Sequence, residues 1–242
     1  MYIASTDPYF TSDNTEDYSI SELNTSLEKS HDTATGPDEI HYQFLKHLSP
    51  ESLLVLLDIF NSIWATGNFP KAWREGTIIP IAKPGKDAKN PTNYRPISLT
   101  SCLCKTMERM INTRLVWFIE SNGFISNYQS GFRYGYSTTD QLVRLEAFIR
   151  DGFVRNHHVV SVFFDLEKAY DTTWKYGILK DLYHLGLRGR MPLFIKQFLM
   201  DRVFRVRLRT VMSELHNQEM GVPQGSILVV TLSFRKLTVS LK

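Results

Sequence analysis

Cysteine is nearly absent from this chain, which has two in 242 residues. Cys102 and Cys104 are too few and too close together for a disulfide framework or a four-ligand zinc site. We therefore expect reduced thiols in an intracellular protein. Long apolar runs are absent as well, since no stretch approaches the roughly 20 residues that span a bilayer, and Met1–Ser30 lacks the order of a signal peptide. These absences argue against secretion and against a membrane partner.

The composition is that of a globular protein, with 43% hydrophobic and 12% aromatic residues, enough for one large domain or two subdomains. The net charge of +3 hides a gradient, because six acidic residues against Lys29 give residues 1–30 a charge of −5 and leave +8 on the remainder. A basic body fits a polyanionic partner. Residues 1–34 are polar and acidic, which predicts a disordered linker.

Helical and strand patterns alternate along the rest of the chain, which predicts an α+β fold. Glu51–Trp64 is apolar almost all round and precedes Gly67, which predicts a mostly buried helix with a stop signal. Thr138-x-x-Gln141 has the form of a capping box before an amphipathic helix with an apolar face. A strand is expected over Thr77–Ala82, which Pro80 confines to a sheet edge, and another over Val203–Leu208.

The stretch Ser161–Asp171, SVFFDLEKAYD, is the most informative part of the sequence. Val159–Phe164 has the pattern of a strand buried on both faces, and Asp165 ends it with a charge that needs a cation. An alternative for Asp165 alone is a carboxylate that caps the following turn. About fifty residues later, Gly221–Ser226 reads GVPQGS, a turn whose backbone can lie flat against a flat ligand.

Together these stretches resemble the reverse transcriptase of non-LTR (LINE-type, jockey-like) retrotransposons, over about Thr35–Leu232. The resemblance implies a right-hand polymerase fold, with mostly helical fingers on an antiparallel palm sheet. It divides the chain into the linker 1–34, a partial reverse transcriptase domain at 35–232 with fingers and an incomplete palm, and a divergent, truncated tail at 233–242.

The family's first catalytic aspartate corresponds to Asp165. The resemblance implies that this carboxylate, with the backbone carbonyl of Leu166, binds Mg²⁺ or Mn²⁺, the cofactor of nucleotidyl transfer.

Five further residues match positions that bind the incoming deoxynucleoside triphosphate. The resemblance implies that Lys83 and Arg95, in a basic turn-rich segment, clamp the triphosphate. It implies further that Tyr170 excludes a 2′-hydroxyl, that Gln224 packs against the nascent base pair, and that Gly225 lets the backbone come close.

The partners implied are an RNA template and a DNA primer. Within Gln129–Asp140, QSGFRYGYSTTD, the family holds its template, so Phe132 and Arg133 are predicted to contact it by stacking and by phosphate pairing. The oligomeric state is not indicated.

The predicted activity is RNA-directed DNA polymerase. The family's aromatic-Ala-Asp-Asp turn, which supplies its other metal carboxylates, does not occur in this sequence, so we expect this chain alone to be inactive. Three alternatives stay open: a non-catalytic nucleic-acid-binding remnant, an intron-maturase-like reverse transcriptase, and an aspartyl-phosphate phosphatase with Glu167 as its second acid. The run NYRPISLTSCLCKTMERMI favours the retrotransposon enzyme over the maturase.

Overall fold

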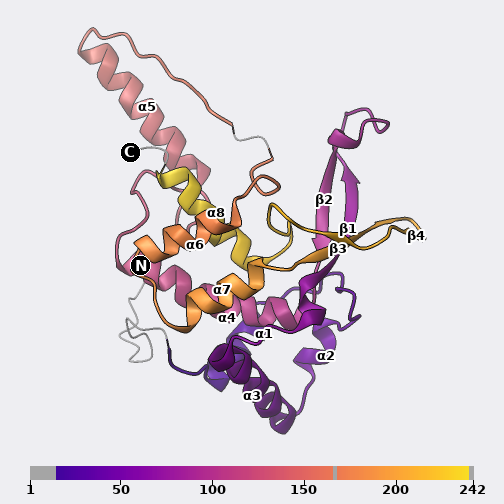
Figure 1. Cartoon of the computed structure of the whole chain (residues 1–242). Helices are drawn as coiled ribbons and strands as arrows, with labels where there is room; N and C mark the ends of the chain where they lie inside the picture. The colour runs from indigo at the N-terminus through magenta and orange to yellow at the C-terminus, as the bar shows by residue number, and fades with distance from the viewer. Residues whose placement is uncertain (1–14, 166–167, 240–242) are drawn as a thin grey trace.

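The computed structural model describes residues 15–165 and 168–239, with side chains up to residue 233. A helical body carries two projections, a β-ribbon on one side and a solitary helix on the other (Figure 1). The described helices are α1 (Ile20–Glu28), α2 (Tyr42–Lys46), α3 (Pro50–Thr66), α4 (Cys102–Ser121), α5 (Thr138–Val154), α6 (Lys175–His184), α7 (Arg190–Leu199) and α8 (Ile227–Val239). The arrangement is a mixed α and β fold, as the sequence predicts.

The helix α4 runs through the centre of the body and contacts both α1 and α8. Its buried face carries apolar side chains at helical spacing together with three buried charged residues, Lys105, Glu108 and Arg114. A second part of the core is aromatic, where α3 meets α7. Edge-to-face and tilted pairs of rings join Phe60, Trp64, Phe69, Trp73, Phe194 and Phe198 there.

The helix α3 confirms the predicted helix and its stop signal, but the prediction of a mostly buried surface is wrong, because Leu54, Val55 and Ile59 are at least 50% exposed. Ser49 is its N-cap, Pro50 occupies the first turn, and Gly67 ends it at a φ of +70°. Each residue type is one that stabilises a helix end without help from distant parts of the chain.

The prediction of an unpacked linker over residues 1–34 is wrong where the structure describes that segment. Ser19 and Glu22 form a capping box that starts α1, and Leu23 and Leu27 reach the core. Arg114 of α4, 2% exposed, binds both carboxylate oxygens of Glu22 at 2.8 and 3.0 Å. A few apolar residues are enough to pack α1 against the core, because Leu23 and Leu27 lie one helical turn apart. The buried Arg114 also needs Glu22 as its acidic partner.

The sheet comprises β1 (Glu75–Ala82), β2 (Tyr94–Leu99), β3 (Val203–Leu208), β4 (Val211–Met212) and β5 (His216–Asn217), in the order β2-β1-β3-β4, with β5 also on β3. It is mixed rather than antiparallel, since β1 pairs with β2 antiparallel but with β3 parallel. The prediction of β1 as an edge strand holds only for its end. Pairing with β3 stops at Ile78, so Pro80 lies where β2 is the neighbour.

The predicted buried strand over Val159–Phe164 is wrong. These residues form an irregular stretch with Val160, Phe163 and Phe164 at least 82% exposed. A strand needs a partner for its backbone groups, and none of the described segments pairs with it. The apolar pattern is typical of a strand inside a sheet, but a sequence pattern does not show whether a neighbouring strand is present.

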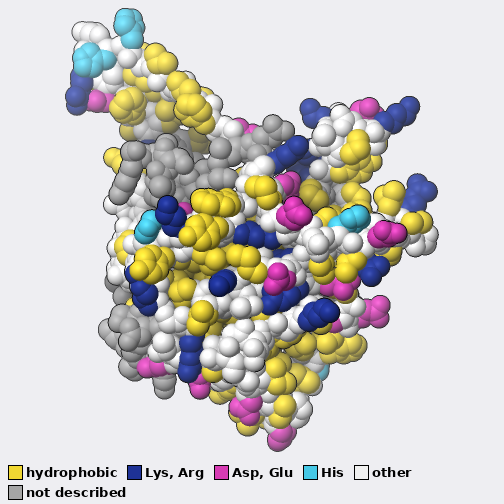
Figure 2. Space-filling model, viewed as in Figure 1, with side chains coloured by type: hydrophobic (Ala, Val, Ile, Leu, Met, Phe, Trp, Pro, Cys, Tyr) yellow, Lys and Arg dark blue, Asp and Glu magenta, His cyan; other side chains and the backbone are white. Residues whose placement is uncertain are grey.

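The helix α5 is the solitary projection of Figure 1, and Figure 2 shows hydrophobic side chains open to solvent along it. Its predicted apolar face is not buried, since Leu142 is 65% and Phe153 is 72% exposed. The capping box also lies one residue earlier than predicted, between Ser137 and Asp140. None of the helices in the described part of the chain is both long and apolar enough to span a membrane.

The helix α8 continues to Val239, through most of the predicted divergent tail at 233–242. The tail is therefore not a separate unit where its backbone is described, because seven of its residues extend a helix that begins in the core.

Candidate functional site

The GVPQGS turn lies between two other segments of the chain and is hydrogen-bonded to both. On one side, Val222 N–H donates to the carbonyl of Tyr170 at 3.0 Å, and Gly221 N–H donates to Thr173 at 3.0 Å. On the other side, Ser98 N–H of β2 donates to the carbonyl of Gln224 at 2.7 Å. Two motifs that lie about fifty residues apart in sequence are thus neighbours in space.

Two glycines make this close approach possible. Gly221 has a φ of +76°, and a Cβ there would lie 2.7 Å from the carbonyl oxygen of Asp171. Gly225 has a φ of +133°, and a Cβ there would lie 2.4 Å from the carbonyl oxygen of Ser98. Both positions need a residue without a side chain, for backbone conformation and for space.

A small cavity of about 40 Å³ lies under the turn, among Ser98, Asp171, Arg202, Gln218 and Gln224. A ligand pocket for a molecule of nucleotide size has a volume of several hundred Å³. The cavity therefore has room for a few water molecules at most, and any nucleotide would lie on the open side of the turn.

Two buried cations bind backbone carbonyls near this cavity, which Arg202 and Gln218 line. Arg202 donates to the carbonyls of Phe198 at 3.0 Å and Trp73 at 3.4 Å, and burial lowers its pKa. Lys175 donates to the carbonyl of Gln218, and burial, followed by the charge of Arg202, lowers its pKa. Both side chains bind backbone oxygens, so their charges organise the protein rather than face solvent.

The predicted phosphate clamp lies on the β1–β2 ribbon. Lys83 lies at the end of the ribbon. Its backbone N–H donates to the carbonyl of Asn93 at 2.8 Å, and its ammonium group donates to the carbonyl of Thr92 at 3.1 Å. Arg95 pairs with Ile81 within the ribbon and is exposed. Side chains alternate along a strand, so Arg95 extends from the face opposite to Ser98, which lines the cavity.

The predicted metal ligands are not assembled in the described part of the chain. Asp165 is exposed at the end of the irregular stretch, and Leu166 lies outside the described residues. Among residues 15–165 and 168–239, no group of three or more His, Cys, Asp or Glu side chains could hold a metal ion. A single carboxylate does not fit a site for two divalent cations.

Arg133 has a structural role that the sequence did not reveal. Its Nε and Nη2 donate to the carboxylate of Glu120 at 2.9 and 2.7 Å, and its Nη1 donates to the carbonyls of Ser126 and Gln129. Four of its five N–H donors are thereby used, and the side chain is 8% exposed. One N–H donor is left for a template phosphate, so the pairing of Arg133 with the template stays a prediction.

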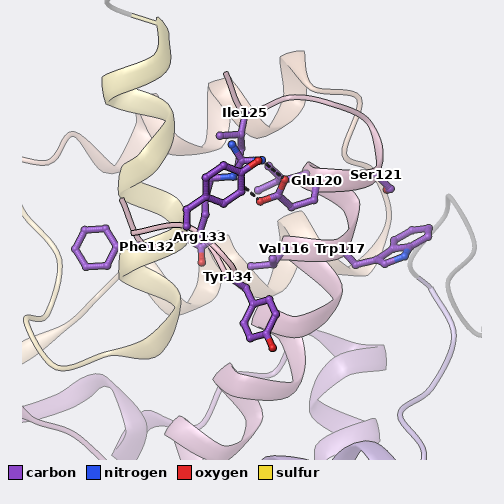
Figure 3. Close-up of a pocket in the computed structure, with 11 residues that line it drawn as sticks. Val116, Trp117, Glu120, Ser121, Ile125, Phe132, Arg133 and Tyr134 are labelled. Atoms are coloured by element: carbon purple, nitrogen blue, oxygen red, sulfur yellow. Dashed lines mark hydrogen bonds and ion pairs between the residues drawn. The ribbon is translucent and has the colours of Figure 1, made fainter. Parts of the chain in front are cut away.

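A cavity of about 350 Å³ adjoins this ion pair, between the end of α4, the loop 125–136 and α8. Figure 3 shows Arg133 directed at Glu120, while Phe132 and Tyr134 point away from the pair. Phe132 is 73% exposed and has a φ of +57°. None of the described residues that line this cavity also lines the small cavity beside the GVPQGS turn.

Ser98 and Arg202 belong to the site but were missed by sequence reasoning. Ser98 contributes its backbone, which carries no sequence signal. Arg202 directly precedes the predicted strand Val203–Leu208, so it resembled an ordinary exposed cation. Only the tertiary structure shows that both adjoin the turn.

Residues 81–241 match the reverse transcriptase (RNA-dependent DNA polymerase) family, and the chain belongs to that family. The match extends beyond Leu232, where we expected the resemblance to end.

Its relatives include RNA-directed DNA polymerases of transposons. It is 35% identical over 206 residues to the probable RNA-directed DNA polymerase of transposon X-element, and 36% identical over 199 residues to that of mobile element jockey, both from Drosophila melanogaster. These alignments cover 84% and 82% of this chain and 22% of each relative. The predicted relationship to jockey-like, non-LTR retrotransposons is confirmed, and the chain spans about a fifth of the length of these relatives.

Proposed function

We propose that this chain takes part in RNA-templated DNA synthesis, as the fingers and part of the palm of a non-LTR retrotransposon reverse transcriptase. The contact of the GVPQGS turn with both Tyr170 and β2 is the observation that carries the proposal. It joins three segments that the family uses for one nucleotide, although they are far apart in sequence.

In this proposal the outer surface of the turn is the base platform. Gln224 contacts the nascent base pair, and Gly225 gives the backbone its close approach. Lys83 and Arg95 hold the triphosphate, for which the β1–β2 ribbon must bend over the turn or the nucleotide must extend around the edge of β2. An exposed guanidinium and an ammonium group both suit phosphate oxygens.

We propose Tyr170 as the residue that selects against ribonucleotides. Its ring is partly buried against the core, which fixes its orientation. A fixed ring beside C2′ rejects an additional oxygen through steric repulsion. Replacement of Tyr170 by Ala should therefore narrow the difference in affinity between deoxyribonucleotides and ribonucleotides, whereas an unchanged ratio would make it a packing residue.

Enzymes of this family use divalent metal ions. We propose Asp165 as the carboxylate of this chain that contributes to Mg²⁺ or Mn²⁺ binding, with the Leu166 carbonyl beside it. One carboxylate does not balance two divalent cations, so no catalytic step follows from it alone. Phe132, exposed at the tip of its loop, is the residue that we propose for stacking on an unpaired template base.

A binding experiment with matched charge changes tests the proposal. The chain is titrated with a fluorescent dATP analogue in the presence of an annealed RNA template and DNA primer. Lys83→Ala/Arg95→Ala should weaken nucleotide binding by about tenfold, because two phosphate contacts are lost. Lys86→Ala/Lys89→Ala removes the same charge from the exposed turn that joins β1 and β2, and should change the affinity by less than about twofold. An equal loss of nucleotide affinity in both variants would mean that Lys83 and Arg95 act only through general electrostatic attraction.

A further inference from the structure

Glu108 is a carboxylate on the buried face of α4, fully shielded from solvent. A buried carboxylate is costly unless hydrogen bonds and positive charge compensate it. Three of its hydrogen bonds come from the residues that follow the PQG sequence. Ser226 donates its hydroxyl to Glu108 Oε2 at 2.5 Å, and the backbone N–H of Ile227 donates to the same oxygen at 2.8 Å.

The first turn of α8 adds to this. Leu228 N–H approaches Oε2 at 3.4 Å, and the N-terminal N–H groups of a helix have no partner within it. The positive end of the helix dipole then lies against the carboxylate. Glu108 therefore caps α8 from outside the helix. The other oxygen, Oε1, accepts a hydrogen bond from the Cys104 thiol at 3.3 Å, and the charge of Glu108 also acts on the buried Arg202.

The turn is thus fixed at two points that flank Gly225. On its N-terminal side the carbonyl of Gln224 is held by Ser98 of β2, and on its C-terminal side Ser226 is held by Glu108. The strand that holds Gln224 also carries Arg95, three residues before Ser98. Displacement of the turn would therefore change the distance between the base platform and the phosphate clamp.

We propose that Glu108 is a positioning residue for nucleotide binding, which acts by clamping the GVPQGS turn through Ser226 and the first turn of α8. The effect on nucleotide binding rests on the proposed function, whereas the hydrogen bonds of Glu108 to the turn and to α8 do not depend on it. Glu108 touches no substrate, and its effect reaches the nucleotide through the orientation of Gln224.

Hydrogen exchange of individual backbone amides tests the clamp directly. Glu108→Gln keeps one acceptor oxygen but removes the negative charge that strengthens its hydrogen bonds with the first turn of α8. Exchange at Ile227 and Leu228 should therefore accelerate by about tenfold. Protection at the Ser98 amide should fall with it, while the amides of α3 and α7 keep theirs. Nucleotide affinity should fall by about fivefold under the conditions given above.

Glu120→Gln is the matched control, since it makes the same change on the same helix and breaks the ion pair with Arg133. It should leave exchange at Ile227 and Leu228 and the nucleotide affinity within about twofold of the wild type. If Glu108→Gln fails to fold, Ser226→Ala removes one donor from the clamp and should show the same pattern more weakly.

The outcomes separate the two proposals. Unchanged exchange at Ile227 and Leu228 in Glu108→Gln would show that Glu108 does not hold the turn. Accelerated exchange with unchanged nucleotide affinity would show that holding the turn does not position the nucleotide. If the wild-type chain binds no nucleotide, the proposed function fails and the positioning role fails with it. The clamp itself is then decided by the exchange rates alone.

Discussion

Single residues around the GVPQGS turn have little freedom to change, because backbone from three segments meets there. Gly225 is the most constrained of them, since both its φ of +133° and the Ser98 oxygen oppose any side chain. The polar residues below it are equally constrained by partners. The consequence is that small substitutions at this point should have effects out of proportion to their size.

Replacement of Gly225 by Ala should lower the free energy of unfolding by about 2–4 kcal/mol, from backbone strain and from the collision with Ser98. Urea unfolding followed by circular dichroism measures it. Gly131→Ala is the control, because a Cβ there meets nothing within 4 Å and its φ is not in the left-handed region. A Gly225→Ala variant as stable as Gly131→Ala would show that the turn can move away from β2.

The two thiols should be unreactive in the folded chain. Burial, together with the charge of Glu108, raises the pKa of Cys104 well above its usual range, and burial also raises that of Cys102. A raised pKa leaves less thiolate at pH 8, so reaction with an aromatic disulfide reagent should be slow until urea unfolds the protein. An exposed Ser161→Cys variant gives the rate of an accessible thiol. Fast reaction of two thiols in the native wild type would contradict the burial of α4.

Among the elements, α1 shows how a short acidic segment joins a core. It contributes two leucines and the carboxylate that neutralises Arg114, whose guanidinium also lies 3.8 Å from the centre of the Tyr18 ring. The segment is thereby bound by packing, by charge and by stacking at once.

Glu22→Gln should therefore destabilise the chain by about 2–3 kcal/mol, because it leaves a buried guanidinium without its anion. The change in the midpoint of urea unfolding measures the loss. Glu28→Gln makes the same substitution at an exposed position of the same helix, for which no ion pair is seen in the described structure, and should have little effect. Similar midpoints for the two variants would mean that α1 is not held through Arg114.

How well an element could be predicted depended on where its stabilising partners lie. The ends of α3 are set by Ser49, Pro50 and Gly67 themselves, so they were predictable. The parallel pairing of β1 with β3 joins residues far apart in sequence, and no local pattern encodes it. Arg133 looked like a free cation because a sequence shows a charge but not its partner. The sequence motifs indicated that Tyr170 and Gln224 belong to one site, whereas no motif indicated a role for Glu108.

At the scale of the whole molecule, the body is well packed but two adjoining parts of the chain are not. The helix α5 and the stretch Val159–Phe164 expose apolar side chains that a soluble surface rarely leaves uncovered over such a length. The stretch also has no charge, proline or glycine before Asp165, which is the composition of segments that pair with one another between molecules.

We accordingly expect concentration-dependent self-association that Val162→Ser/Phe164→Ser reduces, because the change removes exposed apolar surface from an unpaired segment. Light scattering over a range of protein concentrations measures it, and the free energy of unfolding should change by less than about 0.5 kcal/mol. Ile59→Ser, at an exposed position of α3, is the control. Equal improvement in both variants would assign the association to exposed apolar surface in general.

The parallel pairing of Glu75 with Val203 has a consequence for how the chain is made. On a ribosome, β1 begins to emerge roughly 130 residues before β3, and β2 is complete roughly 105 residues before it. At cellular elongation rates this is a delay on the order of ten seconds. During that time the nascent β1 has an open edge that its own chain cannot yet cover. The β1–β2 hairpin is therefore the part of the protein for which we expect chaperones to matter most during translation.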